Sequence, residues 1–148
     1  ALAEAAARGV RVVLLLQGRV EYVLLHYASR ALYRYFLDAG VEIYEYHRSF
    51  LHAKVAVVDG RWATVGSSNI DPMSLLLARE ANVMIEDAGF ACDLRASLAE
   101  AMELGAQRVQ PQTWQHQTLT VRILTWICYE FVRFMTGWSS YGRAQEFK

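Results

Sequence analysis

The feature that most constrains the fold is a pair of short apolar segments, residues 51–58 and 62–65, on either side of Asp59-Gly60. An Asp-Gly pair between two segments of β-prone residues is typical of a tight β-hairpin, because both residues tolerate the positive φ angles that such a turn requires. The chain is therefore predicted to contain an antiparallel pair of strands here.

Further strands and helices are predicted on both sides of this hairpin. Residues 10–16 form a nearly continuous apolar run, which predicts a strand covered on both faces. Residues 41–46 alternate strictly and predict a strand with one polar face, and residues 80–85 are a further strand candidate. Helical spacing predicts helices over residues 22–39 and 90–104, each followed by a glycine. Because strands and helices alternate, we expect an α/β layered domain.

Composition narrows the class of protein. The chain has 148 residues, 54% of them apolar, with a mean hydropathy of +0.11, which suits one globular domain. Fifteen basic residues balance fifteen acidic ones, which argues against a nucleic-acid-binding surface. Cys92 and Cys128 lack the spacing of a zinc site or a disulfide framework and predict buried free thiols. The sequence does not begin with Met and opens inside a predicted helix, so we expect a fragment of a longer protein.

The end of the sequence differs in character from the rest. We predict a lobe over residues 1–106, a Gln- and Thr-rich linker over 107–118, and an amphipathic helical tail over 119–148. On a helical wheel the apolar half of the tail holds Val121, Ile123, Leu124, Ile127, Cys128, Phe131, Val132, Phe134, Met135 and Trp138. The other half holds Arg122, Thr125, Tyr129, Arg133 and Thr136. Such a helix can lie in a membrane interface with its arginines toward anionic headgroups, or it can dock on a missing lobe. No apolar run is long enough to predict a spanning helix.

Two segments carry the chemistry of the sequence. HAKVAVVDG (residues 52–60) and GSSN (66–69) together match His-x-Lys-x4-Asp-x6-Gly-Ser-x-Asn at every position. Side chains two residues apart on a strand share a face, so His52 and Lys54 should project together. A nucleophile and a cation would then meet one phosphate group.

The residue types fit phosphoryl chemistry. An imidazole such as that of His52 can attack phosphorus, and the Lys54 ammonium can neutralise phosphate oxygens. Ser67 and Asn69 are again two residues apart, and both can donate hydrogen bonds to the developing charge. This chemistry uses no metal ion or other cofactor, and we expect none.

Two carboxylates complete the candidate site. Asp59 belongs to the same signature as His52 and Lys54, and its odd spacing from His52 predicts a structural hydrogen-bond and charge partner that points away from the phosphate. Glu80 lies at the head of the next predicted strand, where it is expected to bind the second ring nitrogen of His52 and orient the imidazole.

With these residues the sequence resembles the phospholipase D superfamily and its His-Lys-Asp signature, and within it the bacterial cardiolipin synthases. The likeness covers about residues 1–105 and includes LLLQGRVEY, DAGVEIYEY, FLHAKVAVVDG and VGSSNIDPMSLLLAREANV. The resemblance implies a layered α/β sandwich with helices flanking a mixed β-sheet, followed here by the amphipathic helix. It also implies a site shared by two lobes, each with one His-Lys-Asp set, in which one histidine attacks and the other acts as acid and base.

The resemblance further implies a phosphatidyltransferase that makes cardiolipin from phosphatidylglycerol through a phosphohistidine. Its expected place is the periphery of the bacterial inner membrane, with the catalytic lobe in the cytoplasm. Because one signature is present, the expected partners are phosphatidylglycerol, the membrane surface and a second lobe, from the same full-length chain or a homodimer, with no nucleic acid. The alternatives are a single-signature nuclease or phosphodiesterase that acts as a dimer, and a membrane-binding module with a vestigial site.

Overall fold

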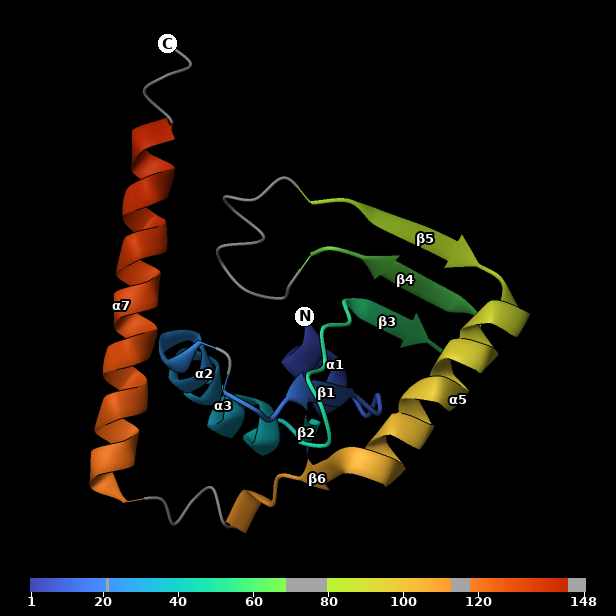
Figure 1. Cartoon of the computed structure of the whole chain (residues 1–148), viewed down its shortest axis with the longest axis horizontal. Coiled ribbons are helices and arrows are strands. Elements are labelled where there is room, and N and C mark those ends of the chain that lie inside the picture. Colours follow the sequence, from blue (N-terminus) through green and yellow to red (C-terminus); the bar gives the residue numbers. More distant parts are fainter. Residues whose placement is uncertain (21, 69–79, 113–117, 144–148) are drawn as a thin grey trace. The chain divides into compact units, whose positions relative to one another are not determined.

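The computed structural model describes residues 1–20, 22–68, 80–112 and 118–143, the last eight of these by their backbone alone (Figure 1). Its elements are α1 (Leu2–Ala7), β1 (Val13–Gln17), α2 (Val23–Arg30), α3 (Tyr33–Asp38), β2 (Glu42–Tyr46), β3 (Val55–Val58), β4 (Trp62–Gly66), β5 (Asn82–Glu86), α5 (Ala88–Gly105), β6 (Ala106–Arg108) and α7 (Leu119–Arg143). The mixed α/β class predicted from the sequence is confirmed.

The chain forms two compact units, each with its own three-stranded sheet. The first unit comprises Ala1–Leu51 and Ala101–Val132, and the second comprises His52–Glu100 and the part of α7 from Arg133. The boundary predicted after residue 106 is a different division of the chain, and it stays a prediction.

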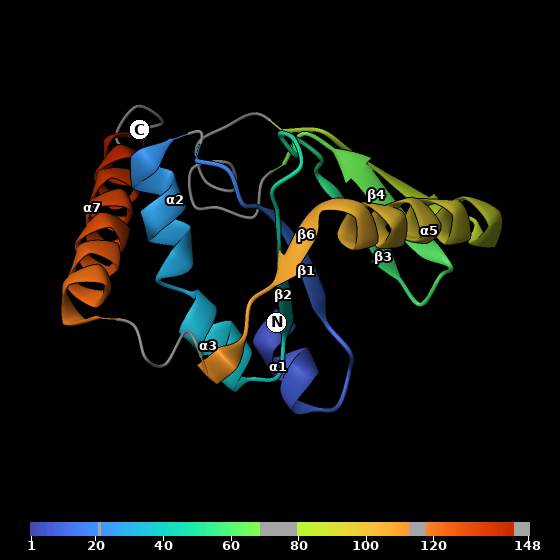
Figure 2. The ribbon, with the colours of Figure 1, turned by 60° about the horizontal axis from the view of Figure 1, so that its bottom comes forward.

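The sheet of the first unit is mixed. β1 and β2 pair in parallel from Val13↔Glu42 to Gln17↔Tyr46, and β6 pairs antiparallel with β2 on its other side (Figure 2). The alternation predicted for β2 is confirmed, because Ile43 and Glu45 are buried and their neighbours are half-buried. Strand β6 occupies the start of the segment predicted to be a linker.

The predicted helix over residues 22–39 is wrong in one respect, since it is broken at Ala31–Leu32 into α2 and α3. The two halves bury different faces. Tyr33 of α3 packs with Val41 and Ile43 against the sheet, whereas Ala28 of α2 packs with two residues of α7. The break at Ala31–Leu32 therefore lets α2 pack on α7 while α3 packs on the sheet.

A buried carboxylate joins α2 and α3 to the sheet. Glu45 on β2 is 8% exposed, and its oxygens accept hydrogen bonds from the Arg30 guanidinium, at 2.7 and 2.8 Å to Nη2, and from the Tyr33 hydroxyl at 3.1 Å. Burial, and next the charge of Glu45, raise the pKa of the Tyr33 phenol far above its usual range. Glu45 therefore connects Arg30 of α2 and Tyr33 of α3 to β2.

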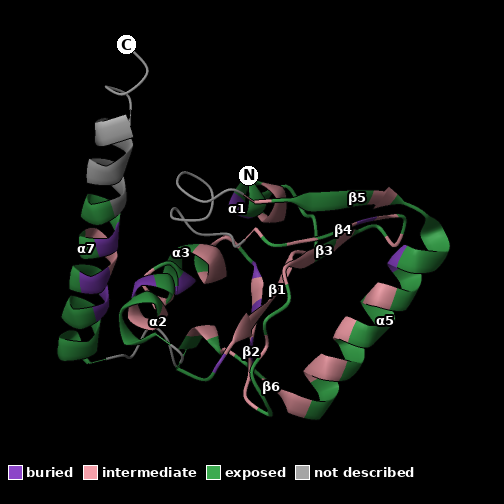
Figure 3. Cartoon of the chain, turned by 45° about the horizontal axis from the view of Figure 1, so that its top comes forward, coloured by how far each residue is buried: buried purple, intermediate pink, exposed green. Residues whose placement is uncertain are grey.

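Helix α7 lies against α2 along a narrow stripe. Cys128 and Val132 are buried against Ala28, and Thr125 is buried as well (Figure 3). The helical wheel put Thr125 on the polar half, yet its hydroxyl donates to the carbonyl oxygens of Val121 and Arg122 and so is satisfied inside. Cys128 is buried as predicted, whereas Cys92 is exposed.

The second unit is built on the predicted hairpin. Asp59 and Gly60 have φ angles of 53° and 62°, and the Arg61 N–H closes the turn on the Val58 carbonyl at 3.1 Å. Val58 pairs with Trp62, so the turn contains three residues, Asp59–Arg61, and the two positive φ angles allow the chain to reverse within it. β3 and β4 pair from Val55↔Val65 to Val58↔Trp62, and β5 adds on the other side of β4. Strand β3 begins at Val55, so the prediction of a strand from residue 51 is wrong at its start.

Replacing Glu45 with Ala should destabilise the fold strongly. The change removes a carboxylate that accepts hydrogen bonds from Arg30 and Tyr33 inside the fold, and breaking a buried pair typically costs about 3–5 kcal/mol of unfolding free energy. Chemical denaturation monitored by circular dichroism measures this cost.

The matched control is Asp38→Ala, which breaks an exposed pair with Arg34 at 3.5 Å. Exposed pairs of this kind contribute about 0–1 kcal/mol. Equal effects of the two substitutions would contradict the assignment of Glu45 as a structural anchor.

Candidate active site

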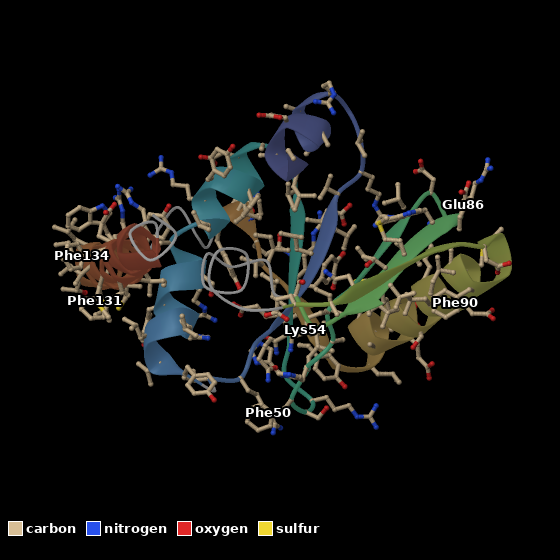
Figure 4. All side chains as sticks on the ribbon, turned by 90° about the horizontal axis from the view of Figure 1, so that it is seen from above. Phe50, Lys54, Glu86, Phe90, Phe131 and Phe134 are labelled. Atoms are coloured by element: carbon tan, nitrogen blue, oxygen red, sulfur yellow. The ribbon has the colours of Figure 1, made fainter. Side chains whose placement is uncertain are left out.

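The signature residues gather at one end of the second sheet. Lys54 lies just before β3, Gly66 ends β4 and Asn82 begins β5. The Gly66 N–H donates to the Lys54 carbonyl at 3.0 Å, and Gly66 is the cross-strand partner of Asn82. Three strands therefore bring Lys54, Gly66 and Asn82 into one row, and Lys54 marks this place in Figure 4.

His52 and Lys54 are in contact, but neither lies within the strand from which they were predicted to project. The Lys54 Nζ atom is 2.6 Å from His52 Nε2. With Lys54 as an ammonium group, which only donates, Nε2 is the acceptor, and a neutral imidazole would then carry its proton on Nδ1. A phosphate oxygen carries more negative charge than the ring nitrogen and is the stronger acceptor for the same ammonium. The Lys54 ammonium can therefore exchange His52 Nε2 for a phosphate oxygen as its acceptor. The lone pair of Nε2 is then free to attack.

Ser67 is held by Glu80 and Ala81, the two residues that precede β5. Its hydroxyl donates to Glu80 Oε2 at 2.5 Å and accepts from the Ala81 N–H at 3.1 Å, while its own N–H donates to the Ala81 carbonyl at 3.0 Å. A hydroxyl has one proton, so the Ser67 donor is directed to Glu80 in this structure. The phosphate-binding role of Ser67 stays a prediction.

Glu80 lies two residues before β5, so the prediction of a strand that begins at residue 80 is wrong at its start. Its hydrogen bond with Ser67 ties it to the segment that follows β4. The predicted hydrogen bond from His52 to Glu80 stays a prediction, and an Nδ1 that carries the proton is the state that such a bond requires.

Two predicted residues lie elsewhere. Asn69 falls outside the described residues. Asp59 is exposed at the tip of the hairpin, separated from Lys54 by the four residues of β3, about 16 Å over five steps at the usual strand rise. It therefore does not join the row formed by Lys54 and Gly66, in line with the expectation that it points away from the phosphate.

Sequence reasoning missed Asn82. Its Nδ2 donates to the Ser68 hydroxyl at 2.7 Å, and its Oδ1 is 3.5 Å from the Ser68 N–H. The only signal in the sequence was a polar residue at the start of a predicted apolar strand, two residues after Glu80. Such a residue is more often a solvated strand end, so the spacing alone does not reveal it.

Within the described part of the chain, no group of three or more His, Cys, Asp or Glu side chains is arranged to hold a metal ion. The groups that do gather are an imidazole, an ammonium, two hydroxyls, a carboxylate and a carboxamide. This set can attack phosphorus, neutralise phosphate charge and donate hydrogen bonds.

Residues 1–102 match the family model described as "Cardiolipin synthase, PLD-like domain". The chain is also 40% identical over 146 residues to "Cardiolipin synthase B" of Escherichia coli K12, a match that covers 93% of this chain and 34% of the relative. It is 36% identical over 131 residues to "Cardiolipin synthase A" of Erwinia tasmaniensis, covering 88% of this chain and 27% of the relative.

The chain thus belongs to the phospholipase D-like family of cardiolipin synthases, as the resemblance in its sequence implied. It spans about a third of the length of the cardiolipin synthase B relative.

Gly66→Ala should open this end of the sheet. A Cβ at residue 66 would lie 2.5 Å from the Ala81 carbonyl oxygen and 2.7 Å from the Asn82 Cα. Both are backbone atoms, at the start of β5 and at the residue before it. Overpacking of this kind costs about 1–3 kcal/mol, which thermal unfolding would detect.

The control is Gly89→Ala in the first turn of α5, where a Cβ would meet only the Asp87 Oδ1 at 3.2 Å. A glycine in a helix is less favourable than alanine by about 0.5–1 kcal/mol, so this variant should be neutral or stabilised. A Gly66→Ala protein as stable as the parent would contradict the close approach of β4 and β5.

Proposed function

We propose that this chain is one half of the active site of a phosphatidyltransferase that makes cardiolipin from phosphatidylglycerol. The observation that carries the proposal is the His52–Lys54 pair, 2.6 Å apart, in a chain that belongs to the cardiolipin synthase family. The balanced charge of the chain also favours a lipid over a nucleic acid as substrate.

The reaction has two displacements. The histidine Nε2 attacks the phosphorus of one phosphatidylglycerol, a P–N bond forms, and the bond from phosphorus to the headgroup glycerol breaks. A general acid protonates the departing glycerol oxygen. The hydroxyl of a second phosphatidylglycerol then attacks the phosphohistidine, loses its proton to a base, and breaks the P–N bond. The products are cardiolipin and glycerol.

In this proposal His52 serves either as the nucleophile or as the acid and base, and a second His-Lys-Asp lobe supplies the other role. That lobe comes from the same full-length chain or from a homodimer. The fraction of the relatives that this chain covers, 34% and 27%, leaves room in a full-length protein for such a lobe. Lys54 and Asn69 would bind the phosphate, and Glu80 would orient the imidazole.

We also propose that the protein acts at the periphery of the bacterial inner membrane, from the cytoplasmic side, through the apolar face of α7. Beside the stripe that packs on α2, Ile123, Ile127 and Phe131 are 49%, 52% and 51% exposed. Figure 4 shows Phe131 on this helix. A row of large apolar side chains next to the exposed Arg122 suits an interface between acyl chains and anionic headgroups. None of the described helices is long and apolar enough to cross a membrane.

The first test of the reaction is His52→Ala in the full-length protein. Loss of a nucleophile or an acid-base group should lower cardiolipin formation by about a thousandfold or more. His26→Ala, which removes an imidazole of α2 outside the signature, should leave the rate near that of the parent.

The assay compares labelled phosphatidylglycerol with single-stranded DNA in separate reactions. Cardiolipin formed and DNA intact is the expected result. Cleaved DNA with untouched lipid would replace the proposal with the dimeric nuclease, and inactivity on both substrates would favour the vestigial binding module.

The membrane proposal is tested with the double variant Ile127→Ser, Phe131→Ser. It removes exposed apolar area, at about 25 cal/mol per Å² buried in the interface, and leaves the Cys128–Val132 stripe on α2 intact. Cosedimentation with phosphatidylglycerol vesicles should fall at least about tenfold, and parent binding should weaken with salt.

The control for vesicle binding is Phe90→Ser on α5, which also removes an exposed phenyl group (Figure 4). An equal loss of binding in this control, or no loss in the double variant, would remove α7 as the membrane contact.

A further inference from the structure

The rim of the second sheet contains a side-chain clasp between β5 and the segment after β4. Asn82 donates from Nδ2 to the Ser68 hydroxyl at 2.7 Å, and the Ser68 N–H points back at Oδ1 at 3.5 Å. The contact forms over Gly66, whose missing side chain leaves the space that the Asn82 carboxamide occupies. Asn82 therefore holds Ser68 at a point where the backbone of β4 has already ended.

The row of paired residues places this clasp on the face of the sheet that Lys54 shares. Cross-strand partners point their side chains to the same face. Because Gly66 is the partner of Asn82 and bonds to Lys54 on its other side, Asn82 and Lys54 flank one residue without a side chain. Two strand spacings, about 10 Å, separate their backbones, and the Asn82 carboxamide lies over Gly66 between them.

The two hydroxyls of the segment differ in where their protons go. Ser67 donates its proton to Glu80, whereas Ser68 accepts from the Asn82 amide. Because the Ser68 oxygen accepts from Asn82, its own proton is directed away from the Asn82 amide. A hydroxyl oxygen held in this way is suited to donate to an incoming anion.

We infer that Asn82 is a positioning residue: by donating to the Ser68 oxygen, it directs the Ser68 proton to a phosphate oxygen of the substrate. The inference rests on the proposed function, since it deepens the account of the same site. In the reaction the Ser68 proton stays on its oxygen, and the hydrogen bond to the phosphate strengthens as negative charge develops there.

Asn82→Asp separates this role from a structural one. An aspartate has the same shape and can keep a hydrogen bond with Ser68, but a carboxylate only accepts, so the bond must reverse and take the Ser68 proton. The fold keeps its clasp while the phosphate loses its donor and gains a nearby negative charge. A purely structural asparagine would tolerate the change.

The experiment measures kcat, KM and the melting temperature of Asn82→Asp, Asn82→Ala, Ser68→Ala and the Asn82→Ala, Ser68→Ala double variant of the full-length protein. Loss of one such donor lowers kcat by about a hundredfold, so Ser68→Ala and Asn82→Asp should each fall by about that factor with KM little changed. Asn82→Ala should fall about tenfold, because Ser68 is released but keeps its proton. The double variant should be no slower than Ser68→Ala. Ser97→Ala on the exposed side of α5 is the matched control and should behave as the parent.

Parent-like kcat in Asn82→Asp with a parent-like melting temperature would overturn the inference, as would parent-like kcat in Ser68→Ala or additive losses in the double variant. If Asn82→Asp does not fold, Ser68→Ala and the double variant decide. Failure of the parent to transfer phosphatidyl groups would count against the proposed function alone. In that case the same ranking of the variants by kcat, measured on a phosphodiester that the parent does cleave, would still test the Asn82 inference.

Discussion

The three-residue turn Asp59–Arg61 fixes the register on which the candidate site depends. With Val58 paired to Trp62, each step outward from the turn adds one pair, and the fourth step brings Lys54 opposite Gly66. A slip of one residue would move each side chain to the other face of the sheet. The positive φ angles of Asp59 and Gly60 therefore determine which residue lies beside the lysine of the signature.

How well the sequence predicts this arrangement depends on the range of the interactions involved. The hairpin follows from local spacing and is confirmed. His52 and Lys54 are in contact, but in the segment before β3 and not on the strand face that their spacing predicted. The break between α2 and α3 does not follow from it, because the apolar spacing of residues 22–39 continues through Ala31. The two helices pack on different partners, since Tyr33 contacts the sheet and Ala28 contacts α7. Apolar periodicity predicts which face of a helix is buried, but not the element against which it packs.

The rim residues show the same limit at the level of single hydrogen bonds. The spacing of Ser67 identifies a hydroxyl near the site, but not that Glu80 receives its proton. Asn82 joins the site through a cross-strand pairing with Gly66, sixteen positions earlier in the sequence. A motif records the residues of one segment, whereas hydrogen bonds across a sheet join segments that the motif does not cover.

The position of Asp59 gives the signature a division of labour. Its histidine and lysine stand at the open end of the hairpin, and its aspartate stands at the closed end, where a left-handed backbone is required. Asp and Asn are among the few residues other than glycine that adopt this conformation readily. A single short pattern thus combines a chemical part with a folding part. A bulky or β-branched residue at position 59 would therefore reduce the fraction of molecules that fold with β3 and β4 in the correct register. The molecules that did fold in this register would carry an unchanged His52–Lys54 pair.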